Sequence, residues 1–189
     1  MFQILRNSWR VPEIRKKILY TLLIIVIFRV GSIIPVPFIN VETLRASMQD
    51  LTAQSGFGEF MNYMNILTGG GLEYGAIFAM SVTPYINSSI IMQLLTIAIP
   101  ALEEMQKDGE DGRKKIASIT RYVTVALALI EATAMTIGFS RAGYLVAEEG
   151  FSKALMYITI VITLTAGSTA MMWIGERITE KGVGNGISI

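Results

Sequence analysis

The sequence has 189 residues, of which 52% are hydrophobic and only 16% are charged, with a formal net charge of +1. Soluble domains usually carry nearer a quarter charged residues, so this composition favours a multi-pass membrane protein. The sequence contains no cysteine and no histidine. Disulfides, cysteine or histidine zinc sites and histidine acid-base catalysis are therefore excluded.

The N-terminal region predicts a membrane anchor with its start on the cytoplasmic side. Residues 1–17 interleave apolar and basic side chains, as an amphipathic segment on an anionic membrane surface does. Residues 18–34 are apolar except for Arg29, and we interpret them as the first crossing. A cleaved signal peptide is disfavoured because Pro35-Val36-Pro37 follows instead of a small-residue cleavage site. Asn40 is a predicted cap for a short outer helix that begins at Val41.

A broken membrane segment follows. The stretch 76–99 is long enough to cross about 30 Å of hydrocarbon, yet it contains Pro84 and several polar residues. Lipid cannot satisfy such groups, so this arm is expected to line protein or a water-filled cavity. The preceding stretch 59–67 spans only about 14 Å as a helix, and Gly69-Gly70-Gly71 join the two. The pattern indicates a re-entrant element of a channel or transporter.

The rest of the chain predicts two further crossings. A charged turn at 103–115 precedes a third crossing at 116–139, and a fourth occupies 153–174. The four crossings define one unit, 18–174, and 175–189 is expected to be a cytoplasmic loop leading into a fifth helix. Its run Gly182 to Gly186 matches neither phosphate-binding template, so we interpret it as a turn.

The distribution of lysine and arginine fixes the expected topology. With the N-terminus inside, only Arg45, Arg141 and Lys153 lie in outer segments, and the other basic residues, apart from the intramembrane Arg29, lie in inner ones. Reversing the orientation would invert this strong bias, contrary to the positive-inside rule.

Val82, Ile86 and Ile90 fall at helical spacing on one face of the long arm. Ordinary helix packing would explain this face, and so would a hydrophobic constriction that closes a pore by dewetting. The polar residues Asn87, Ser88 and Gln93 on the same arm do not choose between these two readings.

Four motifs resemble the SecY family of bacterial protein-translocation channels, in the same order and at matching separations. They are WRVPEIRKKILYTLLIIVIFRVGSIIPVPFI from Trp9, TPYINSSIIMQLLTIAIP from Thr83, KDGEDGRKKIASITRY from Lys107 and GERITEKGVGNGISI from Gly175. The resemblance covers essentially the whole chain. It implies an all-α, multi-pass transmembrane helix bundle with a broken, re-entrant second helix made of a plug and a full-length arm. It also implies that the chain is the N-terminal part of a ten-helix subunit.

The resemblance assigns roles to individual positions. Residues 59–67 match the plug helix, with Glu59, Phe60, Met61, Tyr63, Met64, Ile66 and Leu67 as its residues, and Gly69, Gly70 and Gly71 match the plug hinge. Val82 and Ile86 match pore-ring positions, although the family often has isoleucine at the first of them. The arm, together with the third crossing, matches one wall of a lateral gate, for which we name Asn87, Ser89, Ile90 and Gln93.

The function that the resemblance implies is non-enzymatic passage of unfolded polypeptides across and into the bacterial inner membrane. The implied partners are the C-terminal half of the subunit, SecE, SecG, the SecA motor ATPase or a ribosome, the translocating chain with its signal peptide, and lipid. No cofactor and no direct nucleic-acid contact are expected. Half of a small-substrate secondary transporter is the alternative, but a transporter needs converging polar ligands at the break, whereas this break is glycine beside aliphatic residues. A purely structural scaffold would leave the broken polar helix without a reason.

Two charges interrupt otherwise apolar helices, independently of any family. Arg29 and Glu131 lie about 16 and 18 Å into their respective crossings at 1.5 Å per residue. A lone charge at that depth is costly, so we hypothesise a direct or water-bridged contact between them. The competing interpretations are that Arg29 reaches the outer interface and that Glu131 is protonated or faces a partner.

Overall fold

The computed structural model describes residues 11–54, 56–146 and 152–187, without the side chains of 51–54, 56–58, 60 and 61. The described residues contain seven helices and no β-strand beyond two isolated bridges. The helices are α2 (Pro12–Gly31), α3 (Val41–Gln54), α4 (Gly56–Leu67), α5 (Thr83–Ala98), α6 (Pro100–Lys107), α7 (Glu110–Arg141) and α8 (Lys153–Lys181). The expected all-α fold is confirmed. Most of the expected amphipathic segment 1–17 lies outside the described residues.

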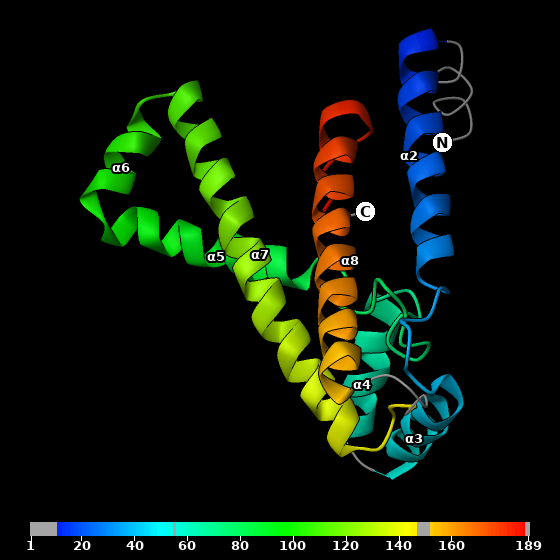
Figure 1. Cartoon of the computed structure of the whole chain (residues 1–189). Coiled ribbons are helices and arrows are strands. Elements are labelled where there is room, and N and C mark those ends of the chain that lie inside the picture. The colour runs from blue at the N-terminus through cyan, green and yellow to red at the C-terminus, as the bar shows by residue number, and fades with distance from the viewer. Residues whose placement is uncertain (1–10, 55, 147–151, 188–189) are drawn as a thin grey trace.

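Helix α8 lies between α7 and α2 and contacts both of them, as well as α5. Figure 1 shows α7 crossing α8 near one end and diverging from it toward the other, so that the two helices form a V. The pair α5 and α6 extends sideways from about mid-height of this V, and α3 and α4 lie together at the end where α7 meets α8.

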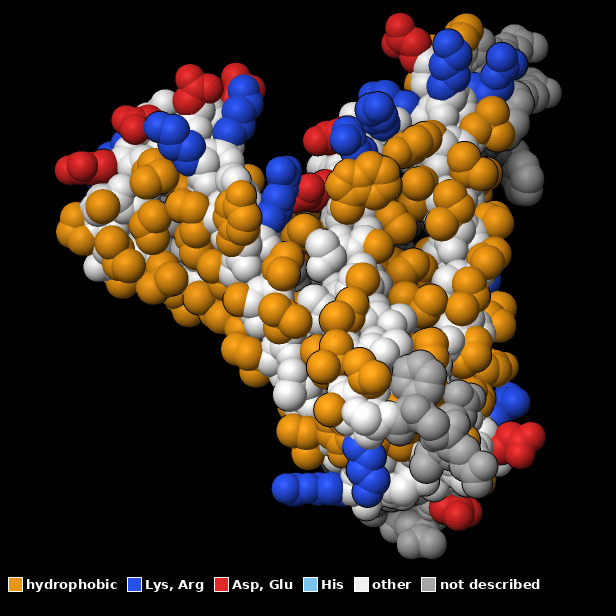
Figure 2. All heavy atoms as spheres, viewed as in Figure 1, with side chains coloured by type: hydrophobic (Ala, Val, Ile, Leu, Met, Phe, Trp, Pro, Cys, Tyr) orange, Lys and Arg blue, Asp and Glu red, His pale blue; other side chains and the backbone are white. Residues whose placement is uncertain are grey.

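Among the described residues, α7 and α8 are long and apolar enough to cross a membrane, and the bent pair α5 and α6 adds a third if it counts as one span. Figure 2 shows apolar side chains over the middle of one face, with charged side chains gathered mostly at its ends. These two or three candidate spans are fewer than the four expected crossings. Helix α2 falls short because its uncharged stretch runs only from Ile18 to Phe28, about 16 Å.

The bounds of two expected elements differ from the sequence prediction. Helix α2 begins at Pro12, which suits a first helical position, and ends at Gly31 rather than near residue 34, because Pro35 disfavours helical geometry in the residue before it. The arm is helical only over Thr83–Ala98, so it is not the full-length helix expected over 76–99. Asn40 caps α3 as predicted, since its Oδ1 accepts hydrogen bonds from the amides of Glu42 at 3.1 Å and Thr43 at 3.2 Å.

The strand-like segment after α2 joins the elements at the lower end of Figure 1. The amide of Val36 donates to the Gly75 carbonyl at 2.9 Å, and the amide of Asn40 donates to the Tyr144 carbonyl at 2.7 Å. Val36 and Leu44 are almost completely buried in the larger apolar cluster. The segment therefore fixes the start of the α5 region and the end of α7 to one core.

Helices α7 and α8 pack through a face of small residues. The buried positions of α7 recur every four residues over much of its length, at Thr120, Thr124, Ala128, Ala132 and Thr136. The threonine hydroxyls there donate to carbonyls four residues earlier, for example Thr136 to Ala132 at 2.7 Å. Such bonds satisfy the hydroxyl within its own helix, so these polar residues need no wet cavity.

Candidate functional site

The segment between α4 and α5 is irregular and lies against the middle of α8. A Cβ atom added to Gly167 would lie 2.1 Å from the Ile77 carbonyl oxygen, so only glycine permits this approach. Gly167 is about 21 Å along α8 at 1.5 Å per residue, close to half its length. The hydroxyl of Ser168 donates to the Ser81 carbonyl at 3.3 Å. Non-helical backbone at this depth is tolerated where protein covers it or where it lines a cavity.

Helix α2 covers the other side of the same segment. A Cβ atom on Gly31 would lie 2.1 Å from the ring of Phe78, and the rings of Phe28 and Phe78 stack with centroids 6.1 Å apart. The amide of Ile77 donates to the Ile34 carbonyl at 3.0 Å. Residues 77–81 are thus held between α2 and α8, and the broken segment that the sequence predicts is present.

The predicted hinge glycines form the end of α4. Gly69 and Gly70 have φ of +64° and +86°, in the left-handed region that favours glycine. The amide of Gly70 donates to the Asn65 carbonyl at 2.8 Å, and that of Gly69 donates to the Ile66 carbonyl at 3.0 Å. This is the Schellman pattern of a helix C-terminus. Gly71 is buried next to it, and the hinge role of the three glycines stays a prediction.

The predicted plug helix forms part of α4, which packs against α3 and against no other described helix. Tyr63, Ile66 and Leu67 are each more than half exposed. Met64 is half-buried and Glu59 is exposed, while the side chains of Phe60 and Met61 lie outside the described part. Helix α4 therefore presents apolar side chains that remain exposed among the described residues.

The two predicted ring residues lie in different surroundings. Val82 immediately precedes α5, and it packs against the apolar cluster of Ile24, Phe78, Met171, Ile174 and Ile178. Ile86 is 41% exposed and Ile90 is 51% exposed. Helix packing thus accounts for Val82, whereas Ile86 and Ile90 keep about half of their surface exposed among the described residues. The ring itself stays a prediction.

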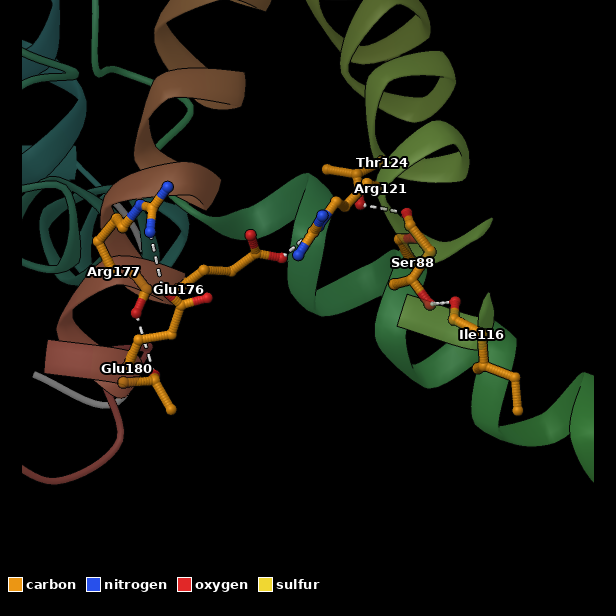
Figure 3. Close-up of polar contacts among 10 residues, drawn as sticks. Ser88, Ile116, Arg121, Thr124, Glu176, Arg177 and Glu180 are labelled. Atoms are coloured by element: carbon orange, nitrogen blue, oxygen red, sulfur yellow. Dashed lines mark hydrogen bonds and ion pairs between the residues drawn. The ribbon is translucent and has the colours of Figure 1, made fainter. Parts of the chain in front are cut away.

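The polar residues of α5 have three different surroundings along α7. Ser88 is fully buried and donates to the Thr120 carbonyl at 2.8 Å, as Figure 3 shows, so it joins the helices and lines no cavity. Ser89 and Gln93 line a groove of about 330 Å³ between α5, α6 and α7, together with Arg113. Asn87 donates to the Glu131 carboxylate at 3.2 Å. Of the proposed gate residues, Ile90 alone lacks a described polar or groove contact.

The hypothesised direct contact between Arg29 and Glu131 is absent among the described ion pairs, and each residue has another partner. Arg29 Nη1 donates to the Gly69 carbonyl at 2.6 Å, at the end of α4. Glu131 accepts from Asn87 on α5. The direct pairing was wrong because equal depth along two helices does not fix their lateral separation. The partner that Arg29 takes is the C-terminal cap of α4.

Sequence reasoning missed two ion pairs that join separate elements. Arg121 Nε of α7 lies 2.8 Å from Glu176 Oε1 of α8, where Figure 3 shows the two side chains pointing toward each other. Arg45 Nε of α3 lies 2.6 Å from Glu73 Oε1 in the irregular segment. A charge toward the N-terminal end of α7 and one toward the C-terminal end of α8 were the only available signals for the first pair. The second offers none, because its residues are 28 positions apart.

Known proteins similar to this chain share one description. The SecY family model matches residues 76–189. The chain is 45% identical over its whole length to the protein translocase subunit SecY of Bacillus subtilis (strain 168), of which it covers 42%. It is 38% identical to the same subunit of Thermotoga maritima, of which it covers 44%.

A structural comparison adds the fold. The solved structure described as a protein conducting channel matches 96% of this chain with a TM-score of 0.54 and 18% identity, and the match covers 38% of that structure's chain. The chain thus spans somewhat less than half the length of the relatives it matches. None of these relatives supports the transporter alternative. With its long apolar helices it is a multi-pass membrane protein, and it belongs to the SecY family.

Proposed function

We propose that this chain forms the N-terminal half of a pore that passes unfolded polypeptides across and into a membrane, as a channel and not as an enzyme. One observation carries the proposal beyond family membership. The short helix α4, with its uncovered apolar side chains, is connected through an irregular segment at mid-length of α8 to α5, whose Ile86 is left exposed. A plug and a pore wall require such surfaces, because their partners move or belong to other segments.

In this proposal α4 is the plug, Gly69 to Gly71 are its hinge, and Val82 and Ile86 contribute to the ring. The groove beside Ser89 and Gln93 belongs to the lateral gate, with Asn87 and Ile90 on the same helix. The exposed aliphatic side chain of Ile86 would seal around a passing polypeptide without binding any particular sequence, since an apolar contact has no directional requirement. Hydrophobic constrictions also oppose ion flow by dewetting.

We infer the membrane, the orientation and the partners from the same relatives and from the distribution of basic residues. The start of α2, the start of α7 and the end of α8 lie at one end of Figure 1, and all three carry basic residues, which supports a cytoplasmic location for that end. We assign the chain to a bacterial inner membrane with the N-terminus inside. Its partners would be the C-terminal half of the subunit, SecE and SecG, and SecA or a ribosome. Such partners would supply energy and the missing wall of the pore.

Cross-linking to an arrested polypeptide tests the proposal. The chain contains no cysteine, so Ile86→Cys introduces one unique thiol in this half of the channel. In the complete, otherwise cysteine-free channel, it should form a disulfide with a cysteine in the middle of an arrested secretory polypeptide. Ile130→Cys is the matched control, because Ile130 is 66% exposed on α7 and lies opposite its buried face. Equal cross-linking at both positions, or none at Ile86, would contradict the proposal.

Ion leakage through the resting channel tests the ring separately. Ile86→Asp should wet the constriction and raise the leakage of small cations. Leu94→Asp, two helical turns further along α5 and also exposed, should raise it less. Conductance of the complete channel in planar bilayers measures both. Equal leakage from the two variants would remove Ile86 from the ring.

A further inference from the structure

A set of polar contacts gathers at the C-terminal end of α4. The Glu73 amide donates to Asn65 Oδ1 at 3.1 Å, and Asn65 Nδ2 donates back to Glu73 Oε2 at 3.1 Å. The second carboxylate oxygen of Glu73 accepts from Arg45 Nε at 2.6 Å. Both oxygens of one carboxylate are thereby used, one toward α4 and one toward α3.

Helix α2 also contacts this end of α4. Arg29 Nη1 donates to the Gly69 carbonyl at 2.6 Å, immediately after α4 ends. The ring of Phe28 lies against the same glycine, so that an added Cβ atom would approach it to 3.2 Å. A helix C-terminus carries partial negative charge, which makes it a favourable partner for a guanidinium group. Two arginines from two helices therefore act on one helix end, Arg29 directly and Arg45 through Glu73.

The arginine on α3 is itself positioned. Its guanidinium carbon lies 5.2 Å from the centre of the Tyr74 ring. The hydrogen bond to Glu73 raises the pKa of Arg45 above its usual value, with a further contribution from Tyr74. Because Arg45 is already fully charged near neutral pH, this contact changes little with pH. It responds to salt instead, since the Arg45 side chain is 49% exposed.

The body of α4 contrasts with this end. Tyr63, Ile66 and Leu67 are more than half exposed, and α3 is the one described helix against which α4 packs. Apolar burial, which usually dominates the placement of a helix, is thus weak at the described side chains of α4. Charge-assisted hydrogen bonds to neighbouring elements take over that role.

We propose that Arg29, Arg45, Asn65 and Glu73 form a clamp that determines how often α4 leaves its resting position. This α4 clamp deepens the proposed function, on which it rests, by naming positioning residues for the plug. Losing one contact changes the population of displaced α4 only several-fold. The clamp therefore holds α4 while allowing its release. Breaking the Glu73 contacts frees the α4 end from α3, and α4 then moves about Gly69 and Gly70.

The test measures the position of α4 directly. Tyr63→Cys on α4 and Leu155→Cys on α8 provide two spin-label sites in the complete, otherwise cysteine-free channel in lipid vesicles, and both native residues are exposed. Distances between the labels are measured by pulsed electron paramagnetic resonance. Glu73→Gln keeps the size of the side chain and should raise the displaced population about three- to tenfold. Arg45→Gln should act in the same direction.

A matched control is available in α8. The Arg177 to Glu180 ion pair also has a short contact, 2.8 Å, but lies far along the chain from α4, and Glu180→Gln should leave the label distances unchanged. Salt gives a control that needs no substitution. Raising the salt concentration from about 0.05 to 1 M should increase the displaced population of the unsubstituted clamp, and have little effect once Glu73→Gln is present.

The outcomes separate the clamp from the channel function. Unchanged distances in both Glu73→Gln and Arg45→Gln, or an equal change in Glu180→Gln, would overturn the clamp. Conductance of the same preparations then tests the plug. A displaced α4 with increased leakage supports both proposals. A displaced α4 without any leakage supports the clamp and contradicts the assignment of α4 as a plug.

Discussion

The threonine hydroxyls of α7 and α8 and the polar groups of the region from α4 to α5 find their partners at different distances along the chain. In α7 and α8 the threonine hydroxyls bond to carbonyls of their own helix four residues earlier, as Thr124 and Thr163 do. From α4 to α5 several polar contacts reach partners 28 to 87 residues away, including those of Glu73, Asn87 and the Ser81 carbonyl. A hydroxyl that bonds within its own helix keeps its partner wherever that helix packs. A region that depends on distant partners changes position when those partners change.

Among single substitutions, the largest effect should come from the close contact between these regions. Gly167→Ala places a Cβ atom 2.1 Å from the Ile77 carbonyl oxygen, so the irregular segment must move. We expect a loss of about 3 kcal/mol in the free energy of unfolding, the upper range for overpacking. Gly138→Ala on α7 is the control, because nothing lies within 4 Å of its added Cβ atom. It should stabilise α7 by up to about 1 kcal/mol. Chemical unfolding of the detergent-solubilised channel measures both.

A charge exchange between Arg29 and Glu131 tests whether each depends on its own partner. Arg29→Glu loses the bond to Gly69, and Glu131→Arg loses the bond from Asn87. Each should cost about 2 kcal/mol, the value of a hydrogen bond to a charged group. The double variant should lose about the sum, since sites without shared partners add. Recovery of assembly in the double variant would instead restore the pairing hypothesis and contradict the separate roles.

Removing single hydroxyls compares a long-range bond with a local one. Ser88→Ala deletes the buried bond from α5 to the Thr120 carbonyl, and we expect a loss of about 1 kcal/mol. Thr163→Val replaces a hydroxyl that bonds within α8, and it should change stability by less than about 0.5 kcal/mol. Thermal unfolding in detergent resolves this difference. Equal losses would show that the two regions do not differ in this respect.

Deleting 59–67 should have only a small effect on the helix bundle, although it removes a whole segment. Helix α4 packs against α3 alone among the described helices, so its removal takes little buried surface from α7 and α8. The unfolding transition of the complete channel should shift by no more than about 1 kcal/mol. Leakage through the resting channel should increase nevertheless. Unchanged conductance after this deletion would contradict the plug assignment.

Local signals in the sequence predicted much of the fold. Alternation of apolar runs with charged turns placed the long helices, and the cap at Asn40, the break at Gly69 to Gly71 and the short helix before it are present in the structure. These features depend on residues within a few positions of one another. Their physical basis is local, in backbone conformation, capping and the burial of one helix face, and a single sequence contains that information.

Tertiary structure decided the partners of the polar residues. The sequence placed Arg29 and Glu131 at equal depth, yet Arg29 bonds to the cap of α4 and Glu131 to Asn87. It also left open whether the polar residues of α5 face protein or a water-filled cavity, and in the structure Ser88 is buried against α7. The separation and rotation of two helices depend on side-chain packing along their whole contact, here on the approach that Gly167 allows. Helical periodicity gives position along an axis, and only the packed structure gives distance across it.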